Sequence, residues 1–311
     1  MKIIALFPVK NEKWILTTTI PQLKLFADEI LCVDGGSTDG TKEYLESQGV
    51  IVRDQDQTNL NYSSWRQELL EWGRERDGTH FVWLDADESF TTNFLAHYKE
   101  DIASLKPGQK LVMQWLCLWK SARQYRDDKS VWSNLYKDFI FCDDGISVFE
   151  NIKLHEGRTP GKNDDSVRIK ISPEHGAVLH FQIAAFNRSQ IKQVFQRCRE
   201  LTLGTGSVYR INYKYSETLD TPSAKTTKVP DAWVEGMPEI DTIEDTDESW
   251  YNTAILNFFK DKGIIFFEPL EIWHIKKYKD IFLKEVGREP RIKTYPHIII
   301  FLNRIKNKVL R

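Results

Sequence analysis

Residues 1–90 alternate between short apolar runs and longer amphipathic stretches, and this alternation limits the folds that the chain can adopt. The apolar runs are rich in β-branched and aromatic residues, as buried strands are. We expect strands at residues 3–7, 29–33, 50–53 and 81–84. The stretches between them predict helices at residues 13–26, 39–48 and 61–74. Strands that alternate with helices favour an α/β fold, in which helices flank a mostly parallel sheet.

The last of these strands ends in a pair of acidic residues. Residues 81–84 lead directly into Asp85-Ala-Asp87-Glu88. Alternate residues of an extended chain point the same way, so Asp85 and Asp87 would project together at the carboxyl end, where open α/β sheets bind ligands. Such a pair favours Mg²⁺ or Mn²⁺ carrying a substrate phosphate. Alone, so short a motif is more often a solvated turn or a helix N-cap, and its neighbours must decide.

Polar loops follow the first two predicted strands as well. The first is Pro8-Val-Lys-Asn-Glu12, and the second is Asp34-Gly-Gly-Ser-Thr-Asp-Gly-Thr41. The glycines of the second loop permit a tight turn and the close approach of a ligand. If the strands are parallel, both loops lie at the same edge of the sheet as the Asp pair.

The rest of the chain is less regular. We expect strands at residues 110–119 and 176–181 and helices at residues 92–105 and 189–201. The composition changes near Tyr215, because residues 216–230 are rich in Ser, Thr, Lys and Pro, as linkers are. We therefore predict a catalytic domain over residues 1–215 and a largely helical C-terminal extension over residues 216–311.

Charge and cysteine content bound the class of protein. The chain has 43 basic and 45 acidic side chains, a balance that gives no support to nucleic-acid binding. Its four cysteines are scattered without a C-x-x-C pair, so we expect reduced thiols in a cytoplasmic protein. No apolar run approaches the length of a membrane span, and residues 2–7 run into a strand without a cleavable signal.

The C-terminal stretch, residues 291–311, is basic and apolar and has no acidic residue. It could contact an anionic membrane surface, which would place the protein at the inner face of the membrane. The alternative, which we favour slightly, is a C-terminal helix docked on the domain. Residues 216–311 could also cover the substrate site or form a homo-oligomer contact.

The three polar loops, in this order and spacing, resemble those of the family-2 glycosyltransferases, which have the GT-A fold with its Rossmann-like sheet. The resemblance is strong over residues 1–95 and extends more loosely to about residue 185. In that second part Leu154-His-Glu156 and Val178-Leu-His180 are similar to landmarks of many family members. The resemblance implies transfer of a sugar, with inversion, from a nucleotide-sugar donor to a hydroxyl of a glycan or glycolipid acceptor.

The resemblance also implies roles for the residues of the first two loops. Pro8, Asn11, Glu12 and Gly36 would lie around the nucleotide, and Asp34 would accept a hydrogen bond from the base or ribose. Arg66 matches a basic position near the diphosphate, which a guanidinium suits. For Glu12 and Arg66 the alternative is an ordinary surface ion pair.

In the family the Asp pair and a late histidine form a metal site. Asp87 is the expected direct ligand of Mn²⁺ or Mg²⁺, Asp85 would hold the metal and the ribose, and His180 would complete the site. The metal would neutralise the leaving nucleoside diphosphate. The alternative for His180 is a core histidine, and Glu88 would only cap the next helix.

The general base of an inverting transfer is a carboxylate near the acceptor hydroxyl. Glu156 is the first candidate. Asp143 and Asp144 are the next, although Asp-Asp-Gly also suits a turn. For Arg158 two roles stay open: one is to shape the acceptor or phosphate site, and the other is purely structural.

We connect the predicted sugar transfer with bacterial surface polysaccharide or lipopolysaccharide synthesis. Two other functions are alternatives to it. The first is a haloacid-dehalogenase-type phosphatase, in which Asp85 would be a nucleophile. Those enzymes usually carry the Asp pair after the first strand, whereas here it follows the fourth. The second is a non-catalytic module that keeps the GT-A fold and binds a nucleotide or a sugar.

Overall fold

The computed structural model describes residues 1–55, 62–128, 130, 132–149, 157–161, 164–216, 224–246 and 249–294. The chain forms two compact units. The first, which we call the sheet unit, consists of Met1–Ala184 and Lys225–Glu244, and the second, the helical unit, of Ala185–Ala224 and Asp245–Arg311. The chain passes between the units after residues 184, 224 and 244, and the predicted boundary at residue 215 coincides with none of these three points.

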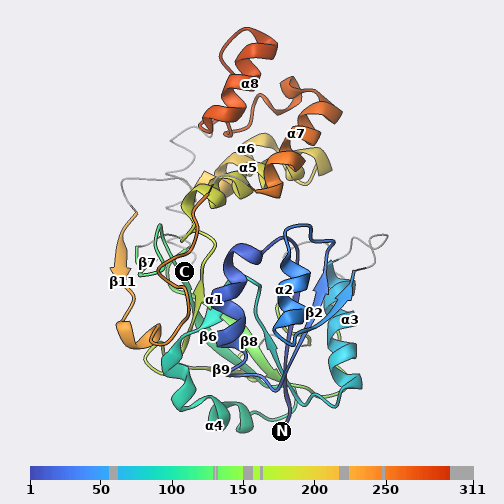
Figure 1. The fold of residues 1–311 in the computed structure, drawn as a ribbon, viewed down its shortest axis with the longest axis vertical. Helices are drawn as coiled ribbons and strands as arrows, with labels where there is room; N and C mark the ends of the chain where they lie inside the picture. Colours follow the sequence, from blue (N-terminus) through green and yellow to red (C-terminus); the bar gives the residue numbers. More distant parts are fainter. Residues whose placement is uncertain are drawn as a thin grey trace. The chain divides into compact units, whose positions relative to one another are not determined.

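The sheet unit, drawn as a ribbon in Figure 1, is built on a nine-stranded sheet. Its strand order is β3-β2-β1-β4-β8-β6-β10-β5, and β9 also pairs with β6. The strands are β1 (Ile3–Val9), β2 (Glu29–Asp34), β3 (Ile51–Asp54), β4 (His80–Trp83), β5 (Glu88–Phe90), β6 (Lys110–Cys117), β8 (Leu135–Cys142), β9 (Arg168–Lys170) and β10 (Ala177–His180). A separate pair joins β7 (Gln124–Arg126) to β11 (Thr226–Lys228) and so holds residues 225–244 to this unit.

Strand direction decides which loops meet. β1, β2, β3 and β4 are mutually parallel. β8 runs antiparallel to both β4 and β6, so β6 and its parallel partner β10 point the same way as β1. The carboxyl ends of β1, β2, β4, β6 and β10 therefore share one edge of the sheet with the amino end of β8. We call this the carboxyl edge.

Helices cover both faces of the sheet, which explains why the central strands read as continuous apolar runs. The helices are α1 (Lys13–Leu23), α2 (Thr41–Ser47), α3 (Tyr62–Glu75) and α4 (Tyr98–Ala103). In β1, Ala5 and Phe7 pack in the core cluster that includes α1, whereas Ile4 and Leu6 pack in the cluster that includes α3. The period of two in a strand thus sends alternate side chains to different helices.

The predicted fold class, an α/β fold with a mostly parallel sheet and a largely helical C-terminal part, is confirmed. The strands and helices expected in residues 1–90 are present with shifts of a few residues at their ends. The helix expected at 92–105 is instead a 3-10 turn, Thr92–Ala96, followed by α4. Strands β5, β7, β8, β9 and β11 were not expected, since their periodicity is short or irregular.

The helical unit contains α5 (Phe186–Leu203), α6 (Val208–Ser216), α7 (Trp250–Lys262) and α8 (Lys276–Val286), with a 3-10 turn at Ile264–Phe267. Its core gathers Ile191, Val194 and Cys198 of α5 with aromatic side chains of α7 and α8. All four cysteines of the chain are buried free thiols, as expected. Within the described residues no helix is both long and apolar enough to cross a membrane. Most of the basic C-terminal stretch, residues 295–311, lies outside the described residues.

Candidate active site

The two carboxylates after β4 turn to different partners. Asp85 Oδ2 lies 2.8 Å from Arg158 Nη2 and forms an ion pair with it. Asp87 Oδ2 lies 3.6 Å from His180 Nε2, and both of these side chains are buried. The backbone supports this arrangement, because the carbonyl of Asp87 accepts a hydrogen bond from the N–H of Phe181. The structure thus brings together the Asp pair and the late histidine at the carboxyl edge, as the sequence predicted.

Glu88 accepts hydrogen bonds from several residues of this edge, a role that the sequence analysis did not predict. Its side chain is fully buried and accepts hydrogen bonds from both Nη atoms of Arg158, at 2.5 and 2.7 Å. Trp115 Nε1 donates to the same carboxylate at 2.6 Å, and the backbone N–H of Asp85 donates at 2.9 Å. The prediction that Glu88 caps a helix is wrong, because Glu88 begins β5, which pairs with β10.

The arginine affects the charge state of Asp85. Partial burial opposes ionisation of Asp85, but the positive charges of Arg158, Arg66 and Lys137 together outweigh it and lower the pKa of that carboxyl. Burial also favours loss of the Arg158 proton, but the charges of Asp85 and Glu88 prevail and raise the pKa of the guanidinium. Asp85 and Arg158 are therefore both charged at neutral pH, and the guanidinium takes the place beside Asp85 where a cation was expected.

Aromatic stacking fixes the remaining side chains of the edge. The ring of Trp115, on β6, stacks on His180 with centroids 4.2 Å apart. On β8, Lys137 places its Nζ 3.3 Å from the centroid of the Trp115 ring. Burial and the charge of Arg158 lower the pKa of Lys137 to about 8. Neither Trp115 nor Lys137 carried a sequence signal, because strand pairing alone brings them here.

The metal prediction is met only in part by this geometry. Within the described ranges, no group of three or more His, Cys, Asp or Glu side chains is arranged to hold a metal ion. Asp85 is engaged by Arg158, which leaves Asp87 and His180 as the adjacent candidate ligands. A carboxylate and an imidazole fit Mn²⁺, and metals of this kind commonly take their other ligands from substrate phosphates and water. The donor set therefore fits a metal with two protein ligands.

The loops after β1 and β2 are tied to each other. Asn11 adopts a left-handed backbone conformation with φ of 54°. Its side-chain oxygen accepts a hydrogen bond from Thr38 N at 2.7 Å, and its N–H donates to Ser37 Oγ at 2.8 Å. Glu12 N donates to Thr41 Oγ1 at 3.0 Å, and the Glu12 carboxylate accepts from Trp14 Nε1. The predicted nucleotide-binding loops thus form one connected structure at the carboxyl edge.

Asp34 organises the second loop. Its Oδ2 accepts hydrogen bonds from Gly36 N at 3.1 Å and from Ser37 N at 2.8 Å, and its Oδ1 accepts from Ser37 Oγ. Gly36 has φ of 78°, which suits glycine. A carboxylate has about four acceptor positions. Asp34 therefore has little capacity left for a nucleotide, and its contact with base or ribose stays a prediction. Pro8 lies in β1 opposite Val33.

Arg66 projects from α3 toward the Asp pair. Its Nη1 donates to the carbonyl of Gly157 at 2.5 Å, and its guanidinium carbon lies 5.3 Å from the Trp83 ring centroid. Its charge contributes to the lowered pKa of Asp85, after burial and the larger effect of Arg158. The structure therefore places a cation near Asp85, and its contact with a diphosphate stays a prediction.

The structure gives different outcomes for the predicted general-base residues. Glu156 lies outside the described residues. Asp144 follows the carboxyl end of β8, where Cys142 pairs with His80 at the start of β4. Five residues of extended chain separate His80 from Asp85, a distance of roughly 16 Å at about 3.3 Å per residue. Asp144 is therefore at the opposite edge of the sheet, and its prediction as a base is wrong.

Asp143 and Asp144 instead build the turn after β8. Asp143 forms an ion pair with Arg74, with Oδ1 2.7 Å from Nη2. Asp144 accepts hydrogen bonds from Ile146 N at 3.0 Å and from Ser147 N at 2.7 Å. Burial opposes ionisation of Asp144, but these hydrogen bonds prevail and lower its pKa. The turn reading of Asp-Asp-Gly is the one that the structure supports.

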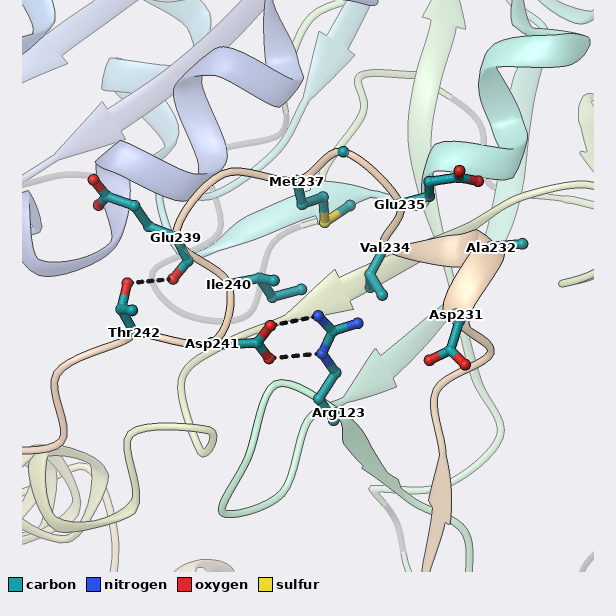
Figure 2. Close-up of a pocket in the computed structure, with 11 residues that line it drawn as sticks. Arg123, Asp231, Ala232, Val234, Glu235, Met237, Glu239, Ile240, Asp241 and Thr242 are labelled. Atoms are coloured by element: carbon teal, nitrogen blue, oxygen red, sulfur yellow. Dashed lines mark hydrogen bonds and ion pairs between the residues drawn. The ribbon is translucent and has the colours of Figure 1, made fainter.

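Figure 2 shows a pocket in the sheet unit. Its volume is about 670 Å³, and none of the predicted site residues is among the described residues that line it. Its lining comes from Arg123 and the segment 231–242. Arg123 closes one side through an ion pair with Asp241, at 2.6 Å, and Thr242 donates to the carbonyl of Glu239 (Figure 2). Among the described residues that line this pocket, Arg123 is the one cation, and its charge is neutralised by Asp241, so these residues do not favour a diphosphate.

Comparison with known proteins gives a family match over part of the chain. Residues 5–144 match the family described as Glycosyl transferase family 2. No curated protein matches the sequence. Among solved structures, residues 1–349 of TarS from S. aureus align with 14% identity over 62% of this chain and 64% of that chain, with a TM-score of 0.35.

Glucosyl-3-phosphoglycerate synthase from Mycobacterium tuberculosis, in complex with phosphoglyceric acid, aligns with 18% identity over 37% of this chain and 44% of that chain, with a TM-score of 0.27. The same synthase in complex with Mg²⁺ and uridine diphosphate aligns with 18% identity over 37% and 43%, also with a TM-score of 0.27. The chain spans less than two thirds of the length of each of these proteins.

Proposed function

We propose that this chain, a member of Glycosyl transferase family 2 over residues 5–144, transfers a sugar with inversion from a nucleotide-sugar donor to a hydroxyl of a glycan or glycolipid acceptor. The observation that carries the proposal is the cluster at the carboxyl edge, where Asp87 lies 3.6 Å from His180 and Arg158 forms an ion pair with Asp85. The charge of Arg66 also acts on Asp85. Acidic, imidazole and guanidinium groups together suit a metal-bound diphosphate.

Each residue of the cluster has a separate task in this proposal. Asp87 and His180 would hold Mn²⁺ or Mg²⁺, which when bound supplies positive charge to the departing diphosphate. Arg66 would contact the diphosphate oxygens. Arg158 fixes the carboxylate of Asp85 through their ion pair, and Asp85 would orient the ribose hydroxyls. Orientation by such fixed groups lowers the barrier because little reorganisation is needed during reaction.

The acceptor side is less defined. An inverting transfer needs a carboxylate on the face opposite the leaving group, and we propose Glu156 for this task. Family membership supports an acceptor of the kind used in bacterial surface polysaccharide or lipopolysaccharide synthesis. It favours the transferase over the phosphatase, and detection of turnover would separate the transferase from a binding module.

The test is a thermal-shift panel of UDP, GDP, CDP and dTDP and their common sugars, each with and without Mn²⁺. A ligand at about a hundred times its dissociation constant stabilises by about 2.7 kcal/mol, which is readable. We expect one nucleotide to give a Mn²⁺-dependent shift that Asp87→Asn abolishes. Asp144→Asn, at the opposite edge, is the matched control and should keep the shift. Failure of every nucleotide to shift the wild-type protein would refute the proposal.

A further inference from the structure

One ring nitrogen of His180 is left without a hydrogen bond. Nε2 of His180 lies 3.6 Å from Asp87 Oδ2, and both side chains are buried. The other nitrogen, Nδ1, is also buried, and within the described residues it has no hydrogen-bond partner. In most metal sites the second nitrogen of a ligating histidine bonds a carboxylate, a carbonyl or a water, and this bond fixes the orientation of the ring. For His180 another contact must fix the ring, because the χ2 torsion of histidine has broad preferences.

Stacking on Trp115 is that contact. The two rings lie with their centroids 4.2 Å apart and their planes 27° from parallel. Trp115 is 5% exposed, so the stack lies away from water. An imidazole that lies flat against an indole cannot turn about its Cβ–Cγ bond without its edge entering the indole. The stack therefore limits the ring of His180 to orientations that keep its plane along the indole.

Strand pairing places three side chains on one face of the sheet. β6 lies between β8 and β10. On β6, Trp115 pairs with Leu135 of β8 and with Val178 of β10. Lys137 and His180 each lie two residues further along their strands, so both project from the same face as Trp115. Such diagonal neighbours are within reach of long and aromatic side chains. Lys137 and His180 therefore approach the indole from opposite sides of β6.

Two contacts hold the indole of Trp115 itself. Lys137 places its Nζ 3.3 Å from the centroid of the ring. The quadrupole of an aromatic ring attracts a cation over its face, and more strongly where water is excluded. At the edge of the ring, Nε1 donates a hydrogen bond of 2.6 Å to the buried carboxylate of Glu88. The indole is thus held at a face and at an edge before any ligand binds.

We propose that Trp115 is a positioning residue, which fixes the plane of the His180 imidazole and so directs Nε2 toward a metal ion held with Asp87. Lys137 and Glu88 keep the indole in place for this task. This role rests on the proposed function, because it concerns the Mn²⁺ or Mg²⁺ that Asp87 and His180 would bind. A ligand whose orientation is fixed in advance loses less conformational freedom on binding. Trp115 should therefore raise the metal affinity without touching metal or substrate.

The first measurement needs no metal. Nuclear magnetic resonance of the full chain, labelled with ¹³C in its seven histidines, resolves their imidazole protons, and His180→Ala identifies the signal of residue 180. Protons over the face of an indole are shifted upfield by its ring current. We expect the His180 signal to be shifted upfield in the wild-type protein and to return toward the ordinary position in Trp115→Leu. A His180 signal at its ordinary position in the wild-type protein would overturn the proposal.

The second measurement is of bound Mn²⁺, in the presence of UDP, GDP, CDP or dTDP, whichever shifts the wild-type Tm. Trp115→Leu should weaken Mn²⁺ binding by at least about tenfold, as the loss of a group that orients a ligating histidine commonly does. Electron spin echo spectroscopy also detects the ¹⁴N of an imidazole bound to Mn²⁺. This nitrogen signal, per bound Mn²⁺, should fall in Trp115→Leu, which a general loss of stability would not cause.

Further variants separate stacking from the other contacts of the indole. Trp115→Phe keeps a ring but loses the donor to Glu88, and it should retain most of the Mn²⁺ affinity and the nitrogen signal. Lys137→Met leaves the indole without its cation and should weaken Mn²⁺ binding several-fold, which keeps the test open if Trp115→Leu does not fold. Phe141→Leu is the control, because Phe141 is a buried aromatic residue of β8 that packs in the cluster that includes α3. It should lower Tm and leave Mn²⁺ binding unchanged.

The possible failures have different meanings. Absence of Mn²⁺ from the wild-type protein would refute the metal site of the proposed function and the role of Trp115 with it. Normal wild-type binding, with unchanged affinity and nitrogen signal in both Trp115→Leu and Lys137→Met, would overturn the role of Trp115 alone. Equal losses in Trp115→Phe and Trp115→Leu would also contradict it, because the hydrogen bond to Glu88 would then account for the effect.

Discussion

Removal of the Arg158 guanidinium should destabilise the sheet unit strongly. Arg158→Met leaves the carboxylate of Glu88 without the two hydrogen bonds that Arg158 donates, at 2.5 and 2.7 Å. The exposed fraction of the Glu88 side chain is 0% and that of Arg158 is 13%, so water cannot replace the lost partner without a rearrangement. Trp115 Nε1 and the backbone N–H of Asp85 still donate to Glu88, but two neutral donors do not balance a buried charge.

The expected magnitude follows from the burial of the pair. Loss of one partner of a buried ion pair costs about 3–5 kcal/mol. We assign this cost to Glu88, because Asp85, with 43% of its side chain exposed, is screened by water and contributes little. At roughly 2–4 °C per kcal/mol for domains of 150–250 residues, Tm should fall by at least about 6 °C.

Thermal unfolding of single and double variants is the assay. Glu88→Gln removes the charge that Arg158 neutralises and keeps an oxygen for Trp115 Nε1. We therefore expect the double variant Arg158→Met with Glu88→Gln to recover part of the stability that Arg158→Met loses. If Arg158→Met lowers Tm by less than about 2 °C, or if the double variant shows additive losses, the assignment of Glu88 as the buried partner is refuted.

The remaining predictions concern pH, packing and the corrected base candidate. The pKa of Lys137 is lowered to about 8, against about 10.4 when unfolded, so the unfolded state binds more protons between these values and stability should rise with pH there. Lys137→Met should lose this rise in Tm relative to the wild type. A Cβ at Gly73 would lie 2.4 Å from Cε1 of the buried Phe81, so Gly73→Ala should destabilise by about 1–3 kcal/mol in urea unfolding. Asp144→Asn should weaken the turn with Ser147 and leave any measured sugar transfer unchanged, whereas a loss of transfer in the folded variant would restore Asp144 as a base.

The sequence predicted the first half of the sheet because local patterns determine it. β1, β2 and β4 are apolar runs whose alternate residues pack on α1 and α3, and this burial on both faces makes the runs continuous. The segment around β8 could not be read in this way. Its side chains Leu135 to Asp138 are only half-buried, and the pattern is mixed over this half of the strand.

The missed direction of β8 explains the wrong assignment of Asp144. Asp144 follows a strand, as Asp85 does, and a sequence gives no direct sign that β8 runs antiparallel to β4. The same limit hid Glu88, Trp115 and Lys137, which meet only through pairing of β5, β6, β8 and β10. Asp87 and His180 were predicted because their motifs resemble those of the family-2 glycosyltransferases. Local periodicity alone would not have identified them.

The division of labour within the Asp pair is the claim most open to direct measurement. Electron paramagnetic resonance can count Mn²⁺ bound in the presence of UDP, GDP, CDP or dTDP, whichever shifts the wild-type Tm. We expect Asp87→Asn and His180→Ala each to lose the bound Mn²⁺, and Asp85→Asn to retain it, because Asp85 is paired with Arg158 at 2.8 Å. Retention of Mn²⁺ by Asp87→Asn, with its loss in Asp85→Asn, would contradict the assignment of Asp87 and His180 as the metal ligands.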